Sequence, residues 1–103
     1  MSSRKKETRR KFRDDVFARD NYKCKFCDIT ENLDAHHICD RNKMPNGGYV
    51  ASNGISLCHT HHMDAEQFHI SGGERWIKGM HPDDLYKLIG SSKEKAVRDS
   101  ERL

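Results

Sequence analysis

The segment Asn53-Gly-Ile-Ser-Leu-Cys-His-Thr-His-His62 contains a Cys-x-x-His pair, Cys58 and His61, on which the fold depends. A Cys-x-x-Cys pair, Cys24-Lys-Phe-Cys27, lies earlier in the chain. This spacing lets two side chains of one tight turn point at a single ion. Together the two pairs predict a tetrahedral structural zinc site with these four residues as ligands.

Two other interpretations of these residues remain open. Cys39 is an alternative fourth ligand, which we rank lower because it shares a strand face with His37 and has no partner at Cys-x-x-Cys or Cys-x-x-His spacing. Cys24 and Cys27 alone would also suit a redox pair, but the βαβ pattern expected around such a pair is absent.

The composition supports a metal-stabilised fold. The chain has 103 residues, of which 34% are hydrophobic, and it contains four Cys and seven His. Leu, Ile, Val and Phe total 18 residues, below the level of about 20% at which disorder becomes a reasonable expectation. A bound metal would compensate for the thin core, because its ligation free energy becomes folding free energy.

The sequence favours a soluble, intracellular protein. No apolar run approaches the roughly 18 residues that span a bilayer, and the first residues, Met1-Ser-Ser-Arg-Lys-Lys, do not resemble a signal peptide. Cys beside His in a reducing compartment indicates metal binding before disulfides. We therefore expect a cytoplasmic location and no membrane partner.

Positive charge is concentrated at the N-terminus. Residues 1–13 hold seven Lys and Arg against one Glu, a net +6, although the whole chain carries +3. Such an arm suits contact with the phosphates of a nucleic acid, the alternative being a solvated helix face with no partner. The candidate phosphate-binding residues of the arm are Arg4, Lys5, Lys6, Arg9, Arg10, Lys11 and Arg13.

Hydrophobic periodicity and turn residues predict an α+β chain. The expected elements are a helix over 8–20, a turn over 21–28, strands over 33–38 and 54–57, a loop over 44–48, and helices over 61–69 and 82–90. The segment from Ser91 is charged and only weakly patterned. Trp76, Leu85, Leu88 and Ile89 are expected to form a small core patch.

These elements predict one domain over residues 1–103. It comprises a basic helical arm (1–20), a zinc-stapled core (21–70) and a C-terminal helical extension (71–103).

Several histidines remain after the zinc ligands are assigned. His36 and His37 are adjacent on an expected strand, so their side chains point to opposite faces. One of them can therefore bind a metal while the other meets solvent or substrate. His62 directly follows the expected zinc ligand His61. The alternative is that His36, His37 and His62 are ordinary surface or core histidines. His59, His69 and His81 are not expected to be ligands.

Three segments together resemble the zinc-stapled HNH endonucleases common among small bacteriophage and bacterial enzymes. They are Cys24-x-x-Cys27, Leu33-Asp-Ala-His-His-Ile38 and Asn53 to His62. The resemblance covers residues 19–66. One departure is that the family usually has Cys-x-x-Cys-His where this chain has Cys58-x-x-His61-His62, a change that keeps tetrahedral zinc ligation possible.

The resemblance implies a ββα-metal (His-Me finger) core with flanking helices. In that family His37 would be the general base, while His36 and His62 would hold a catalytic divalent ion. Asn53 would tie the loop that holds His37 or assist the metal. Glu66 lies one helical turn after His62, so it would be a further ligand, a supporting residue or simply an exposed side chain. The ion would be Mg²⁺ or Mn²⁺, with Zn²⁺ and Ni²⁺ as alternatives.

The implied activity is hydrolysis of DNA, by nicking or double-strand cutting, to 5′-phosphate and 3′-hydroxyl ends. Arg41, shortly after the implied base, would orient the scissile phosphate. The resemblance also implies a bacterial host cell, with a phage gene as one origin. The alternatives are a zinc-ribbon DNA-binding module without catalysis and a small component of a phage packaging or recombination assembly.

Overall fold

Two strands, β1 (Leu33–His37) and β2 (Gly54–Cys58), pair antiparallel at the centre of the molecule, with His37 opposite Gly54. The structure is a computed structural model that describes residues 2–103. Both strands lie where the sequence predicts them, and the architecture is α+β.

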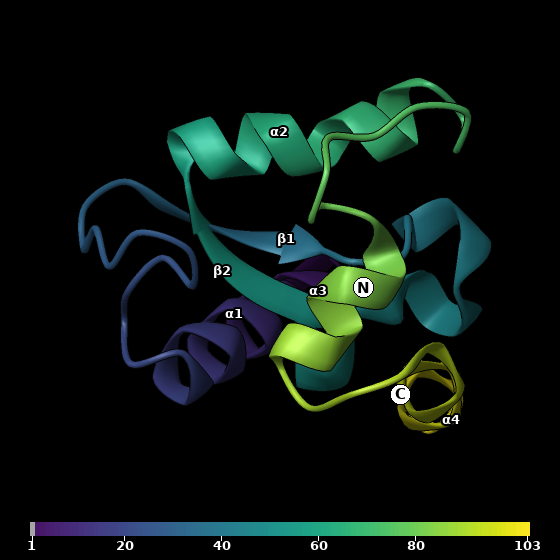
Figure 1. Ribbon diagram of the computed structural model, residues 1–103. Coiled ribbons are helices and arrows are strands. Elements are labelled where there is room, and N and C mark those ends of the chain that lie inside the picture. Colours follow the sequence, from purple (N-terminus) through teal and green to yellow (C-terminus); the bar gives the residue numbers. More distant parts are fainter. Residues whose placement is uncertain (1) are drawn as a thin grey trace.

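Helices α1 (Ser2–Arg19) and α2 (His59–Ile70) lie on either side of the strand pair (Figure 1). Successive strand side chains point to opposite faces, so His36 lies against α2 and His37 lies against α1. The prediction that these adjacent histidines face opposite ways is therefore confirmed. Helix α2 follows β2 directly, which gives the order strand, strand, helix.

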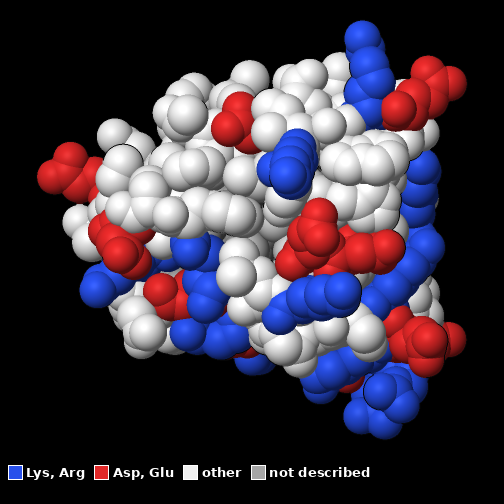
Figure 2. All heavy atoms as spheres, in the orientation of Figure 1, with Lys and Arg blue, Asp and Glu red and all other residues white. Residues whose placement is uncertain are grey.

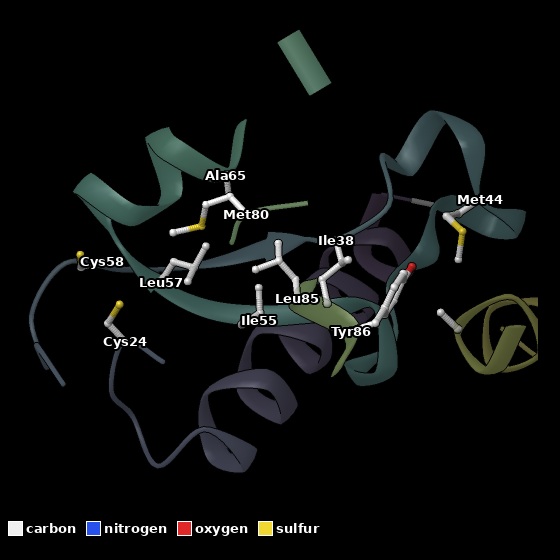
Figure 3. Close-up of a cluster of buried hydrophobic side chains, with 11 residues drawn as sticks. Cys24, Ile38, Met44, Ile55, Leu57, Cys58, Ala65, Met80, Leu85 and Tyr86 are labelled. Atoms are coloured by element: carbon white, nitrogen blue, oxygen red, sulfur yellow. The ribbon is translucent and has the colours of Figure 1, made fainter. Parts of the chain in front are cut away.

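The hydrophobic core lies on the α2 side of the strands (Figure 3). Ile55 and Leu57 of β2 are fully buried there, together with Ile38, which directly follows β1. Leu85 of the short helix α3 (Pro82–Leu88) closes this layer. The sulfur atoms of Cys24 and Cys58 mark one end of the core, which places two of the four predicted zinc ligands at its boundary.

Helix α1 is anchored through its C-terminal end. The Arg19 guanidinium donates hydrogen bonds to the carbonyls of Ala51 and Gly54, at 2.6 Å each. The buried carboxylate of Asp20 accepts a hydrogen bond from the Ser56 backbone N–H at 2.8 Å. These contacts fix the basic helix against β2. The expected helix over 8–20 is confirmed and begins earlier, at Ser2.

None of the helices within residues 2–103 combines the length and apolar character needed to cross a bilayer.

Three short 3₁₀ helices connect β1 to β2: η1 (Arg41–Lys43), η2 (Pro45–Gly48) and η3 (Ala51–Asn53). The expected loop over 44–48 therefore contains a tight turn of its own. Inside that turn Asn46 and Gly47 have φ angles of 51° and 82°. Glycine adopts such an angle without strain, and asparagine tolerates it better than most other residues.

The C-terminal segment is more ordered than its sequence indicates. Residues Lys93–Glu101 form α4, which is capped by Ser92 and packs against η2 and η3. Ala96 and Ser100 are fully buried. The charged, weakly patterned segment therefore forms a packed helix, whose fully buried residues are small and whose one larger apolar residue, Val97, is half-buried against the core.

The expected C-terminal core patch is only partly correct. Leu85 is buried and Ile89 is half-buried, but Leu88 is 43% exposed and Trp76 is 48% exposed. Helix α3 has only seven residues, which limits how many of its side chains can face the core. Trp76 instead lies on the surface against the His81 ring, at 4.7 Å between ring centroids.

Candidate metal centres

The first cluster brings together the four predicted zinc ligands. The turn after α1 supplies Cys24 and Cys27, the end of β2 supplies Cys58, and the first turn of α2 supplies His61. One ligand atom from each lies within 4.8 Å of the others. The Sγ atoms of Cys27 and Cys58 are 3.7 Å apart, and His61 Nδ1 is 3.5 Å from Cys24 Sγ and 3.2 Å from Cys58 Sγ.

These separations fit a tetrahedral zinc ion. Bonds of about 2.3 Å to sulfur and 2.0 Å to nitrogen place neighbouring ligands roughly 3.5–3.8 Å apart. Burial opposes ionisation of Cys24, but backbone N–H groups of Cys58, Phe26 and Cys27 outweigh it and lower the pKa of that thiol to about 7. A thiol that ionises near neutral pH is ready to bind zinc. The cluster could therefore hold a structural zinc ion.

Cys39 is not part of this group among the described residues. Its side chain is half-buried, and its backbone N–H donates a hydrogen bond to the Asn53 side chain at 3.0 Å. The alternative in which Cys39 replaces His61 as fourth ligand is therefore wrong.

The second cluster consists of His36 from β1 and His62 and Glu66 from α2, which could also hold a metal ion. Glu66 Oε1 lies 3.2 Å from His36 Nδ1 and 3.2 Å from His62 Nε2. Metal–ligand bonds of about 2.0–2.2 Å place neighbouring ligands roughly 3.0–3.5 Å apart. The Glu66 oxygen thus has ligand spacing to both histidines, and the ligand atoms of all three residues lie within 4.8 Å of one another.

The hydrogen bonding and charge of this cluster also fit a cation. His36 Nδ1 is buried and makes no hydrogen bond of good geometry, despite its short distance to Glu66. Burial lowers the pKa of His36, so its ring is neutral at neutral pH. The neighbouring His36 lowers the pKa of Glu66 to about 2, which keeps it a carboxylate. A neutral imidazole and a carboxylate are the states in which these groups bind metals.

Asp34 is a member of this site that the sequence analysis missed. Its Oδ2 atom lies 3.1 Å from His62 Nδ1. The hydrogen bond requires the proton on Nδ1, which leaves the Nε2 lone pair directed at the cluster. The available signal was its position two residues before His36, which puts both side chains on the same strand face.

His37 lies on the other face of β1 but borders the same pocket. That pocket has a volume of about 320 Å³ and is also lined by His36, His62, Glu66 and Arg41. Burial, with smaller contributions from His36 and Arg41, lowers the pKa of His37 to about 4. At neutral pH the ring is therefore uncharged and able to accept a proton.

Asn53 is fully buried and uses its whole side-chain amide for structure. Its Oδ1 atom accepts from the Cys39 backbone N–H and the Tyr86 hydroxyl, while Nδ2 donates to the carbonyls of Cys39 and Gly48. No lone pair remains for a metal. Two roles are implied for Asn53: assisting the metal or tying the loop that holds His37. The geometry fits the second, because Asn53 joins the segments that flank the pocket.

The remaining histidines belong to neither cluster within the described residues. His59 is exposed, and His81 caps α3 by accepting from the Asp83 backbone N–H. His69 has a supporting place that was not anticipated: its ring stacks on His36 at 5.2 Å, and its Nε2 atom lies 3.0 Å from the His37 carbonyl.

The predicted phosphate-binding residues, those of the arm and Arg41, are all exposed. Arg4, Lys5, Arg9 and Arg41 line one hollow of about 580 Å³. Lys11 differs because it pairs with Asp15 at 2.7 Å. The face drawn in Figure 2 carries basic and acidic side chains interspersed, so positive charge does not cover the molecule uniformly.

The chain matches no protein-family model, no curated protein and no solved structure at a significant level. The chemistry of the two clusters is therefore what bears on function.

Proposed function

We propose that this chain is a metal-dependent endonuclease of the HNH type, with a ββα-metal core, that hydrolyses phosphodiester bonds of DNA. The observation that carries the proposal is the meeting of His36 Nδ1, His62 Nε2 and Glu66 Oε1 beside a pocket that His37 also lines. A three-ligand cluster open to a pocket, with a neutral imidazole next to it, suits hydrolysis of a phosphate ester.

His37 is assigned as the general base. It is not a member of either metal cluster within the described residues, and it borders the pocket in its neutral form. In this role it accepts the proton of the attacking water. The anionic phosphates of a bound strand oppose the effect of burial and raise the pKa of the ring toward the range useful for a base.

His36, His62 and Glu66 are assigned as ligands of the catalytic ion. A divalent ion held there would stabilise the negative charge that develops on the phosphate and on the leaving 3′-oxygen. Asp34 orients His62 for this purpose. The imidazole and carboxylate set fits Mg²⁺ or Mn²⁺ and also admits Zn²⁺ or Ni²⁺.

Arg41 connects the site to the basic arm. It lines both the metal pocket and the hollow formed with Arg4, Lys5 and Arg9. A phosphate backbone lying in that hollow would reach the pocket past Arg41, whose guanidinium suits phosphate contact. The arm thus supplies affinity while the pocket supplies chemistry.

The zinc cluster is assigned a structural role. It ties the turn after α1 to the junction of β2 and α2, the point from which His62 and Glu66 extend. Four protein ligands leave no open position for substrate, as in structural zinc sites generally.

Incubation of the zinc-loaded protein with supercoiled plasmid, with and without added Mg²⁺ or Mn²⁺, tests the proposal. We expect metal-dependent nicks that DNA ligase reseals, because resealing requires a 5′-phosphate and a 3′-hydroxyl. His37→Ala should abolish nicking, whereas His59→Ala, at an exposed histidine outside both clusters, should not. Protein that retards the plasmid in a gel but leaves it supercoiled at every metal concentration would favour the non-catalytic binding module instead.

A further inference from the structure

The His37 ring is packed between two other aromatic rings. Phe12 of α1 stacks on it, at 4.5 Å between centroids and an interplanar angle of 23°. Tyr49, which directly follows η2, meets it edge-on at 4.7 Å and 90°. Phe12 and Tyr49 also contact each other, at 5.7 Å and 88°. We call these two residues the aromatic clamp.

The rings of the aromatic clamp occupy space that is open because two neighbouring residues are glycines without side chains. Gly54 lies opposite His37 in the strand register, and a Cβ there would come within 2.7 Å of the Phe12 ring. Gly47 has a φ of 82°, and a Cβ on it would come within 2.7 Å of the Tyr49 ring. Side chains at either position would therefore push a clamp ring away from His37.

Ring packing accounts for the orientation of His37 better than hydrogen bonding does. Its Nε2 atom is buried and has no hydrogen-bond partner among the described residues. His62, by contrast, is held by its hydrogen bond to Asp34. Stacked and edge-on contacts between aromatic rings have preferred geometries, so they can fix the plane of an imidazole.

The clamp also contacts the cations assigned to phosphate binding. The Arg41 Nη1 atom donates a hydrogen bond to the Tyr49 hydroxyl at 3.3 Å, and the Arg9 guanidinium lies 5.8 Å from the Tyr49 ring centroid. Tyr49 therefore contacts both His37 and the two arginines.

We propose that Phe12 and Tyr49 are positioning residues that hold His37 at the angle required to take a proton from the attacking water. This inference rests on the nuclease function proposed above. A base displaced by about 1 Å can lose on the order of 100-fold in rate, so removing a clamp ring should affect turnover more than binding.

Four variants test the proposal in the zinc-loaded protein. Phe12→Leu and Tyr49→Leu remove a ring, Tyr49→Phe keeps the ring but loses the hydroxyl, and Phe17→Leu makes the same change as Phe12→Leu elsewhere in α1. Two kinds of measurement are made on each: the kinetics of plasmid nicking, which give kcat and KM, and the ¹H chemical shifts of the His37 imidazole.

We expect Phe12→Leu and Tyr49→Leu to lower kcat by about 10- to 100-fold with little change in KM. Tyr49→Phe should recover most of the kcat lost in Tyr49→Leu, because it restores the ring edge. Phe17→Leu should match wild type. In Phe12→Leu the His37 ring signals should move downfield, because the shielding from the stacked ring is lost.

Two results would overturn the clamp in an active enzyme: a wild-type kcat in both ring-removal variants, or His37 shifts unchanged by Phe12→Leu. A wild-type protein that never cuts plasmid would overturn the proposed function and the positioning role with it. The His37 shifts would then still report whether these rings pack together, so the two failures are distinguishable.

Discussion

Asp34 and His62 are held 3.1 Å apart between β1 and α2, through the carboxylate Oδ2 and the imidazole Nδ1. The bond joins the two elements that supply the second metal cluster, and it sets the ring nitrogen that is left to bind metal. His62 therefore depends on a residue that belongs to neither the zinc motifs nor the implied catalytic set.

Removal of the Asp34 carboxylate should weaken the second metal site. We expect Asp34→Ala to raise the Mn²⁺ concentration needed for half-maximal nicking by about 10- to 100-fold, because the orientation of His62 is no longer fixed. Glu31→Ala, which removes an exposed acidic residue near the same strand, is the matched control. An equal shift in both variants would mean that Asp34 acts only through its charge.

Loss of His37 should remove chemistry without removing metal. We expect His37→Ala to lower kcat by about 10²–10⁴-fold, the usual range for a general base, while its Mn²⁺ requirement stays at the wild-type value. Kinetics over a Mn²⁺ series measures both quantities. If excess Mn²⁺ restores His37→Ala while His36→Ala is inactive at every concentration, the roles of the two histidines must be exchanged.

Zinc removal should unfold the protein. Ligation of a structural zinc is worth about 10–16 kcal/mol in small domains, whereas a whole domain is stable by only about 5–15 kcal/mol. We expect chelation at neutral pH to abolish the native circular dichroism in one cooperative step. Cys27→Ala should lose zinc, and Cys39→Ala, outside the cluster, should retain it. A metal-free sample with an unchanged melting curve would contradict the structural role.

The arm residues should differ in their contribution to DNA affinity. Each phosphate neutralised contributes roughly 0.9 to the slope of log affinity against log salt. We expect Arg9→Ala, which removes a residue lining the hollow beside Arg41, to reduce that slope, and Lys11→Ala to reduce it less because Lys11 is paired with Asp15. Removal of residues 1–11 should reduce it most. Equal slopes in the truncated and intact proteins would show that the arm does not hold the DNA.

Local patterns in the sequence were enough to predict the zinc cluster and the strand pair. The Cys-x-x-Cys and Cys-x-x-His spacings fix ligand direction within one turn, and strand alternation fixes the opposite orientations of His36 and His37. The helical spacing of His62 and Glu66 likewise places both on one face of α2.

Contacts between distant elements could not be predicted in the same way. The aromatic clamp joins α1, β1 and the residue after η2, and Asp34 reaches across to α2. Helix α4 fully buries the small residues Ala96 and Ser100 and half-buries Val97, a set too small and mixed to mark a core-facing helix in the sequence. Its stability comes from tertiary packing, which overrides the weak local pattern.

The most direct test of the central claim is a Mn²⁺ binding titration of the zinc-loaded protein, with electron paramagnetic resonance as the readout. Nicking rates are measured at the same Mn²⁺ concentrations. We predict one Mn²⁺ ion bound per chain, a nicking rate that saturates over the same concentration range, and a parallel shift of both curves to higher Mn²⁺ in His62→Ala. Nicking that proceeds without bound Mn²⁺ or another added divalent ion, or a His62→Ala protein with wild-type binding and cleavage, would contradict the assignment of His36, His62 and Glu66 as the catalytic metal site.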